Sequence, residues 1–216
     1  GEDLPLHGSI ANTPAEQVCW YEEGDALVVR SVTKDETIFG RKLRLSRRLT
    51  VSLQENRFRI EDTIENTGDR VEPFEILYHM NMGYPLLDED SIVKVPAEKV
   101  MPRNDHAAED IGNCLVMEKP TAGYEERCYY HVFADENGEA SIFQPKLGVG
   151  LKMNFNAKEL DGFTEWKMMG IRDYVLGLEC GNCYPDGRDV MRRTGMLKFL
   201  QPGGRKTYTV DITLQG

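Results

Sequence analysis

Apolar and polar residues alternate along most of this 216-residue chain, and that two-residue period constrains the fold more than any other feature. Between residues 43 and 64 the apolar positions keep a regular alternation on each side of the polar turn Gln54–Asn56. Successive side chains of a β-strand point to opposite faces, so this pattern predicts strands with one buried face. No segment shows the period of a long helix. The sequence therefore predicts an all-β fold built from antiparallel strands.

Short polar turns divide the alternating segments into neighbouring strands. The turn at Asn66–Asp69 lies within the alternating region 43–79, so we expect three consecutive antiparallel strands there. A second turn, Asp135–Gly138, predicts a hairpin between the strand-like segments on either side of it. The last strand is expected at residues 207–214, after a Pro-Gly-Gly turn.

The length and composition predict one globular domain over residues 1–216. Hydrophobic residues make up 40% of the chain and charged residues 29%, which is ordinary for a folded soluble domain. The apolar runs are too short to cross a bilayer, so we expect no membrane partner. No secretory signal segment opens the chain, and Gly1 in place of Met is consistent with a trimmed N-terminus.

The charge and the cysteines exclude several classes of function. With 36 acidic and 26 basic residues, the chain has a formal charge of -10 and no basic stripe, which argues against a nucleic-acid partner. The five cysteines are odd in number and too sparse for a disulfide framework, so a cytoplasmic location fits best. Cys180 and Cys183 have the spacing of half a zinc ribbon, but the chain has no second pair. We therefore expect no metal, and plain thiols at this turn.

His79 is the first candidate for chemistry. It lies near the end of a strand-like segment that runs into Gly83 and Pro85. On alternation, His79 and Asn81 share one face, opposite Tyr78 and Met80, so a ligand on that face would meet an imidazole and an amide together. The alternative is a buried structural histidine that bonds a backbone carbonyl.

Glu179 is the second candidate. It ends a very apolar segment that follows a turn at residues 170–173. Burying an unpaired carboxylate costs several kcal/mol, so Glu179 is either a structural hydrogen-bond anchor or a group that accepts a proton from a ligand. A histidine and a carboxylate together supply the acid and the base that opening and reclosing a sugar ring requires.

Two further residues are candidates for binding a sugar. His7 is followed by Gly8, which allows close approach of a ligand, although this signal is weak by itself. Trp166 would offer a flat apolar face for stacking, with Glu165 and Lys167 beside it for hydroxyl groups, or it would pack in the core. His131 is open to the same two readings, as a site residue or a packed one.

Three segments together resemble the aldose 1-epimerase (galactose mutarotase) superfamily, and more closely a mutarotase-like branch of it. They are LHG at residues 6–8, IEDTIENTGDRVEPFEILYHMNMG at 60–83 and YVLGLECGN at 174–182. The resemblance implies an all-β, galactose mutarotase-like β-supersandwich of antiparallel sheets that binds a small-molecule carbohydrate. It also implies that Glu179 takes the proton of the anomeric hydroxyl while His79 protonates the ring oxygen, with no cofactor.

The chain departs from the superfamily pattern in two places. In typical members several strands precede the LHG segment and supply a sugar-binding arginine, whereas this chain begins only a few residues before His7. An edge left exposed by missing strands would favour a homodimer. His79 is followed by Met80 rather than an aromatic residue, so the substrate is expected to differ from galactose or glucose.

Two hypotheses follow from the sequence. The first is an aldose 1-epimerase-like enzyme with His79 as acid, Glu179 as base, and His7, Asn81 and Trp166 as sugar-binding residues. The alternative is a non-catalytic carbohydrate-binding or regulatory domain on the same fold. A lyase or another isomerase also stays open, because a fold does not fix a reaction.

Overall fold

The protein is described by a computed structural model that covers residues 4–216. Strands account for 52% of the described residues and helices for 8%. In the described part of the chain, the longest helix is α2, which has six residues (Arg188–Arg193). The prediction of an all-β fold is therefore confirmed. No helix among residues 4–216 has the length and apolar character needed to cross a lipid bilayer.

The chain divides into two compact units. The first contains the described residues up to Phe74 together with Lys198–Asp211, and the second contains Glu75–Leu197 and Ile212–Gly216. The single domain expected over residues 1–216 stays a prediction.

The first unit is a meander of antiparallel strands in the order β1-β2-β3-β4-β15, with β5 and β14 paired separately. The predicted strand, turn and strand form the β3–β4 hairpin, in which Leu49 lies opposite Ile60. Its elements are η1 (Ile10–Asn12), β1 (Gln17–Glu23), β2 (Ala26–Glu36), β3 (Lys42–Ser52), β4 (Arg57–Asn66), β5 (Glu72–Phe74), β14 (Lys198–Leu200) and β15 (Arg205–Gln215), of which the last residues belong to the second unit.

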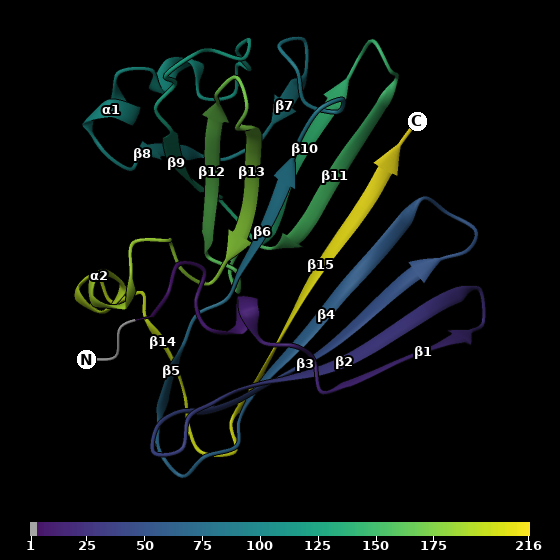
Figure 1. Cartoon of the computed structure of the whole chain (residues 1–216), viewed down its shortest axis with the longest axis vertical. Coiled ribbons are helices and arrows are strands. Elements are labelled where there is room, and N and C mark those ends of the chain that lie inside the picture. The colour runs from purple at the N-terminus through teal and green to yellow at the C-terminus, as the bar shows by residue number, and fades with distance from the viewer. Residues whose placement is uncertain (1–3) are drawn as a thin grey trace. The chain divides into compact units, whose positions relative to one another are not determined.

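The second unit contains a five-stranded sheet in the order β6-β13-β12-β9-β8 and three further strands in the order β11-β10-β7 (Figure 1). The β12–β13 hairpin closes at the predicted turn, where Gly170 N donates to Asp173 O at 3.2 Å. The elements are β6 (Leu77–Met82), β7 (Ile92–Lys94), β8 (Lys99–Pro102), α1 (Asp105–Ala108), η2 (Ile111–Asn113), β9 (Arg127–Val132), β10 (Asn137–Gln144), β11 (Val149–Asn156), β12 (Gly162–Met169), β13 (Tyr174–Gly181) and α2.

Two predicted strand pairings are wrong. After the turn at Asn66–Asp69 the chain does not return beside β4, because β5 pairs with β14 and β6 pairs with β13. The segments around Asp135–Gly138 form no hairpin, since β9 pairs with β8 and β12 while β10 pairs with β7 and β11. Four successive residues of β9, 128–131, are buried. A strand buried on both faces lies inside the fold, and its partners here come from segments that a local turn signal does not reveal.

At β9, other parts of the chain pack against both faces of the five-stranded sheet. On one face a cluster of Cys128, Tyr130, Cys183, Tyr184, Met191 and Leu197 packs α2 and the chain around it onto the sheet. The rings of Tyr130 and Tyr184 stack there at 4.2 Å. On the other face, Ala107 and Cys114 pack against Tyr129 and bring α1 onto the sheet. The cluster with α2 lies on the sheet face that also carries His79, farther along the row of strands.

Candidate functional site

His79 and Glu179 lie side by side on two neighbouring strands of the five-stranded sheet. Glu179 on β13 is directly opposite His79 on β6 in the antiparallel ladder. Nε2 of His79 lies 3.1 Å from Oε1 of Glu179. The alternation of β13 explains the placement, since Leu176 and Leu178 are fully buried on the face opposite to Glu179. The apolar residues of β13 therefore fix which face its carboxylate occupies.

The carboxylate of Glu179 is buried beside a partly open imidazole. The side chain of Glu179 is 2% exposed and that of His79 is 27% exposed. Burial disfavours the charged carboxylate and raises the pKa of Glu179 to about 7. The contact with His79 is close but poorly directed, so Oε1 accepts no hydrogen bond from the residues that the structure describes. A carboxyl group in this state can take or give a proton near neutral pH.

Trp166 lies next to the pair on the same face of the sheet. Its indole meets the His79 ring edge-on, with ring centroids 5.7 Å apart at an interplanar angle of 73°. Its Nε1 donates a 2.7 Å hydrogen bond to Oε2 of Glu126, which fixes the indole plane. The half-buried ring therefore offers an aromatic surface beside the acid and base candidates.

Asn81 shares this face too. It is exposed and lies opposite Gly177 on β13, which in turn lies opposite Trp166 on β12. The prediction that His79 and Asn81 share one face is thus confirmed by the strand register, and the structure brings four of the five predicted site residues together. Their roles in binding and catalysis stay predictions.

His7 is the fifth predicted site residue and belongs to the first unit. It is exposed and lies in a turn with a φ of 66°, before Gly8 with a φ of 71°. Nearby, Ser9 donates a hydrogen bond of 2.7 Å to Asp35, which ties this turn to β2. A sugar-binding role for His7 stays a prediction.

The expectation that Glu165 and Lys167 flank Trp166 at a sugar is wrong. Both side chains are fully buried and point to the opposite face, because neighbouring residues of a strand alternate between faces. Oε2 of Glu165 lies 2.8 Å from Nε2 of His131, whose side chain is also fully buried. Of the two readings of His131, packing is the correct one, and Phe163 meets its ring edge-on.

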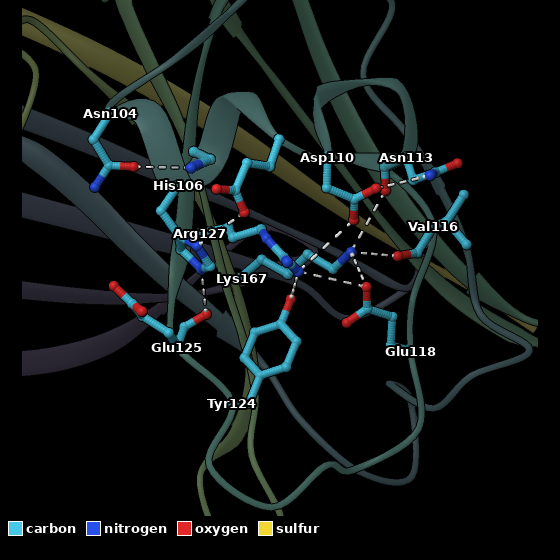
Figure 2. A network of polar contacts seen from close by, with 12 residues as sticks. Asn104, His106, Asp110, Asn113, Val116, Glu118, Tyr124, Glu125, Arg127 and Lys167 are labelled. Carbon is cyan, nitrogen blue, oxygen red and sulfur yellow. Dashed lines mark hydrogen bonds and ion pairs between the residues drawn. The ribbon is translucent and has the colours of Figure 1, made fainter.

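Lys167 anchors the loop that covers this second face. Its Nζ donates to Val116 O at 2.6 Å, and it lies 3.7 Å from the carboxylate of Glu118 (Figure 2). Arg127 on β9 approaches the same carboxylate at 3.6 Å and donates to Tyr124 Oη at 3.0 Å (Figure 2). This network lies on the face opposite to His79 and Glu179.

Three residues near the pair were missed by the sequence reasoning. Thr164 lies opposite Glu179 on β12, and its buried Oγ1 has no hydrogen-bond partner among the described residues. Thr164 is two residues before Trp166 on an alternating strand, so the sequence already indicated that both side chains lie on one face. Glu126 and Gly177 carried no such signal, because their importance depends on the neighbouring strands.

Two cysteines and a cavity of the second unit do not contribute to the His79–Glu179 pair. Cys180 and Cys183 are buried and form no disulfide, and within residues 4–216 no group of three or more His, Cys, Asp or Glu side chains could hold a metal ion. A cavity of about 450 Å³ lies elsewhere in the second unit. Its lining residues are Tyr84, Asp88, Glu89, Pro120, Ile171 and Tyr174.

Comparisons with known proteins identify the fold. A sequence profile of the family described as a domain of unknown function (DUF4432) matches residues 1–214. A Klebsiella pneumoniae structure, provisionally named an aldose 1-epimerase, is similar over 97% of this chain and 57% of its own, with 25% identity and a TM-score of 0.90. The chain therefore spans little more than half of that relative.

Two further solved structures are similar at lower identity. A galactose mutarotase-like protein from Clostridium acetobutylicum has 13% identity and a TM-score of 0.68, over 93% of this chain and 66% of its own. An Escherichia coli protein, also provisionally named an aldose 1-epimerase, has 15% identity and a TM-score of 0.64, over 92% of this chain and 68% of its own. No curated protein sequence matches this chain. The fold is therefore a galactose mutarotase-like β-supersandwich, as the sequence resemblance implied.

Proposed function

The chain belongs to the DUF4432 family, and we propose that it is an aldose 1-epimerase-like enzyme that interconverts the anomers of a free sugar or sugar derivative. One observation carries the proposal. An imidazole and a buried carboxyl group of pKa about 7 lie 3.1 Å apart on one sheet face, beside an aromatic ring. The mutarotase-like names of structures with the same fold support it.

The separation of the pair favours ring opening over hydrolysis of a glycosidic bond. The anomeric hydroxyl and the ring oxygen of a sugar are bonded to the same carbon, so an acid and a base that serve both must be close neighbours. Glycosidases instead hold two carboxyl groups about 5 to 9.5 Å apart, on either side of the bond they cleave. A 3.1 Å contact between His79 and Glu179 fits the first geometry.

Ring opening needs one proton removed and one supplied. Ionised Glu179 takes the proton of the anomeric hydroxyl, the bond from the anomeric carbon to the ring oxygen breaks, and protonated His79 gives its proton to that oxygen. The open aldehyde then rotates about its first carbon–carbon bond. Reclosure reverses the transfers, since neutral His79 takes back the proton from the attacking hydroxyl and Glu179 returns its own to the carbonyl oxygen.

The remaining residues of this face would bind the sugar. The indole of Trp166 would stack on the apolar face of the ring, and the exposed amide of Asn81 would bond hydroxyl groups. Because the Glu126 carboxylate already holds Nε1 of Trp166, the aromatic surface is set before a ligand arrives. His7 is the further candidate that the sequence suggested.

The test is exchange NMR of free aldoses with the protein present. The parent should accelerate exchange between the α and β anomer signals of at least one sugar. His79→Asn and Glu179→Gln should each lower that acceleration by about 10² to 10⁴-fold, the usual contribution of one acid or base. His106→Asn on α1 and Glu125→Gln on an exposed loop are matched controls, and His106 Nε2 lies 3.4 Å from Glu125 O. They should behave as the parent does.

Calorimetry with the same sugars separates the enzyme from a binding domain. Binding without acceleration would leave the non-catalytic carbohydrate-binding reading, and neither binding nor acceleration would refute both. Equal rates for the parent and the Glu179→Gln variant would contradict the assignment of the base.

A further inference from the structure

Gly177 lies in the row of side chains next to the acid and base pair. It is buried on β13, two residues before Glu179 and therefore on the same face. Its cross-strand neighbours are Asn81 on β6 and Trp166 on β12. Among these three positions only residue 177 has no side chain, so a gap exists between the amide and the indole.

The carboxylate of Glu179 fills that gap. A Cβ atom at residue 177 would overlap with Oε1 of Glu179, and it would lie 3.3 Å from Cδ of Glu179 and 3.2 Å from Cβ of Trp166. The backbone of Gly177 does not need a glycine, because its φ is outside the left-handed region. At Gly181, by contrast, a Cβ would lie 2.7 Å from the backbone oxygen of Ile76. The steric restriction at residue 177 therefore comes mainly from one functional side chain.

We propose that Gly177 is a positioning residue, whose missing side chain provides the space that holds the Glu179 carboxylate against His79. The catalytic meaning of this inference rests on the proposed function, but the steric claim does not. Gly177 touches no reacting atom and acts only through Glu179.

An added methyl group should displace the carboxylate without unfolding the protein. The atom that overlaps with the new Cβ is the far end of a flexible side chain, which can turn away at small cost. Asn81 is exposed and His79 is partly exposed, so the way out of the gap leads toward water. The displaced carboxylate loses its 3.1 Å contact with Nε2 of His79 and part of its burial.

The displacement has a readout that a purely structural role would not give. The titratable groups that face the carboxylate are His79 on β6 and the Cys128 thiol on β9. The negative charge of Glu179 helps to raise the pKa of the Cys128 thiol. Thr164 and Trp166 on β12 carry no charge. Since burial is what raises the pKa of Glu179, a carboxylate moved toward water should titrate at lower pH.

The first experiment compares Gly177→Ala with Gly170→Ala. Gly170 lies in the β12–β13 turn, where the nearest atom to an added Cβ is 3.5 Å away, so it is a matched control. The Glu179 titration is followed by ¹³C NMR of glutamate-labelled protein, with the signal assigned by its loss in Glu179→Gln. Gly177→Ala should lower the Glu179 pKa by about one pH unit or more, and it should slow anomer exchange by about ten- to hundredfold. Parent-like titration and exchange would overturn the inference.

A second experiment keeps the steric claim testable without activity. In a Glu179→Ala background the gap is empty, so adding Gly177→Ala should be tolerated better than in the parent. If Gly177→Ala alone fails to fold, a folded double variant supports the inference and an unfolded one refutes it. Equal losses of unfolding midpoint in the two backgrounds also refute it. If the parent protein does not accelerate anomer exchange, the proposed function is refuted and the Gly177 inference is not. The Glu179 titration and the comparison of the two backgrounds still test the role of Gly177.

Discussion

Replacing Glu179 by glutamine should make the protein more stable at alkaline pH while it removes the base. Burial raises the pKa of this carboxyl from its ordinary value of 4.5 to about 7. The folded state thus binds the proton more tightly than the unfolded state does. The protonated form contributes stability that is full below about pH 4.5 and is lost as the pH rises through about 7.

The size of the effect follows from the two pKa values. The pKa of Glu179 rises by about two and a half pH units on folding, and each unit is worth about 1.36 kcal/mol. The contribution of Glu179 to the free energy of unfolding therefore changes by about 3 kcal/mol between low and high pH. Glutamine has the same shape and never ionises. Glu179→Gln should therefore raise the free energy of unfolding by up to about 3 kcal/mol at about pH 8.5, and by little at about pH 4.

Urea unfolding of the parent and the variant at these two pH values measures this difference. Glu125→Gln, at an exposed position of the second unit, is the control and should show no pH-dependent gain. A Glu179→Gln protein that is no more stable than the parent at the higher pH would refute the reasoning, because the ionised carboxylate would then carry no burial cost.

Three further predictions follow from the same geometry. The rate of anomer exchange should rise as Glu179, whose pKa is about 7, ionises to accept a proton, and should fall again at higher pH as His79 loses the proton it must donate; a flat profile would contradict their roles as base and acid. Trp166→Ala should raise the KM by roughly two- to tenfold with a smaller change in kcat, as expected for about 0.5 to 1.5 kcal/mol of ring stacking, and an unchanged KM in saturation kinetics would argue against stacking. Glu165→Ala leaves His131 buried without its partner and should cost about 3 to 5 kcal/mol in denaturant unfolding, while the folded variant keeps the parent kcat. A loss well below 1 kcal/mol, or a changed kcat, would count against a purely structural pair.

The sequence was most informative about faces of strands. Alternation placed His79 and Asn81 on one face correctly, and the apolar run before Glu179 indicated a buried carboxylate. The same rule, applied along β12, would have separated Trp166 from its neighbours. Glu165 lies next to it in the sequence, but the pleat puts the two side chains on opposite faces of the sheet.

The sequence was least informative about which strands are neighbours. The turn Asp135–Gly138 has the residues of a hairpin, yet β9 and β10 take partners from distant parts of the chain. Pairing of this kind is decided by the burial of whole faces, which local residues do not encode. For the same reason the sequence could not indicate that Gly177 leaves room for Glu179, because that role depends on Trp166 and Asn81 from two other strands.

The central claim is that His79 and Glu179 act on one sugar as a single acid and base pair, and a double variant tests it most directly. Anomer exchange is measured for the parent, for His79→Asn, for Glu179→Gln and for both changes together. Groups that act as a unit show non-additive losses, so the double variant should be no slower than the slower single variant. Losses that multiply in the double variant, or a parent that accelerates exchange of no sugar, would contradict the claim.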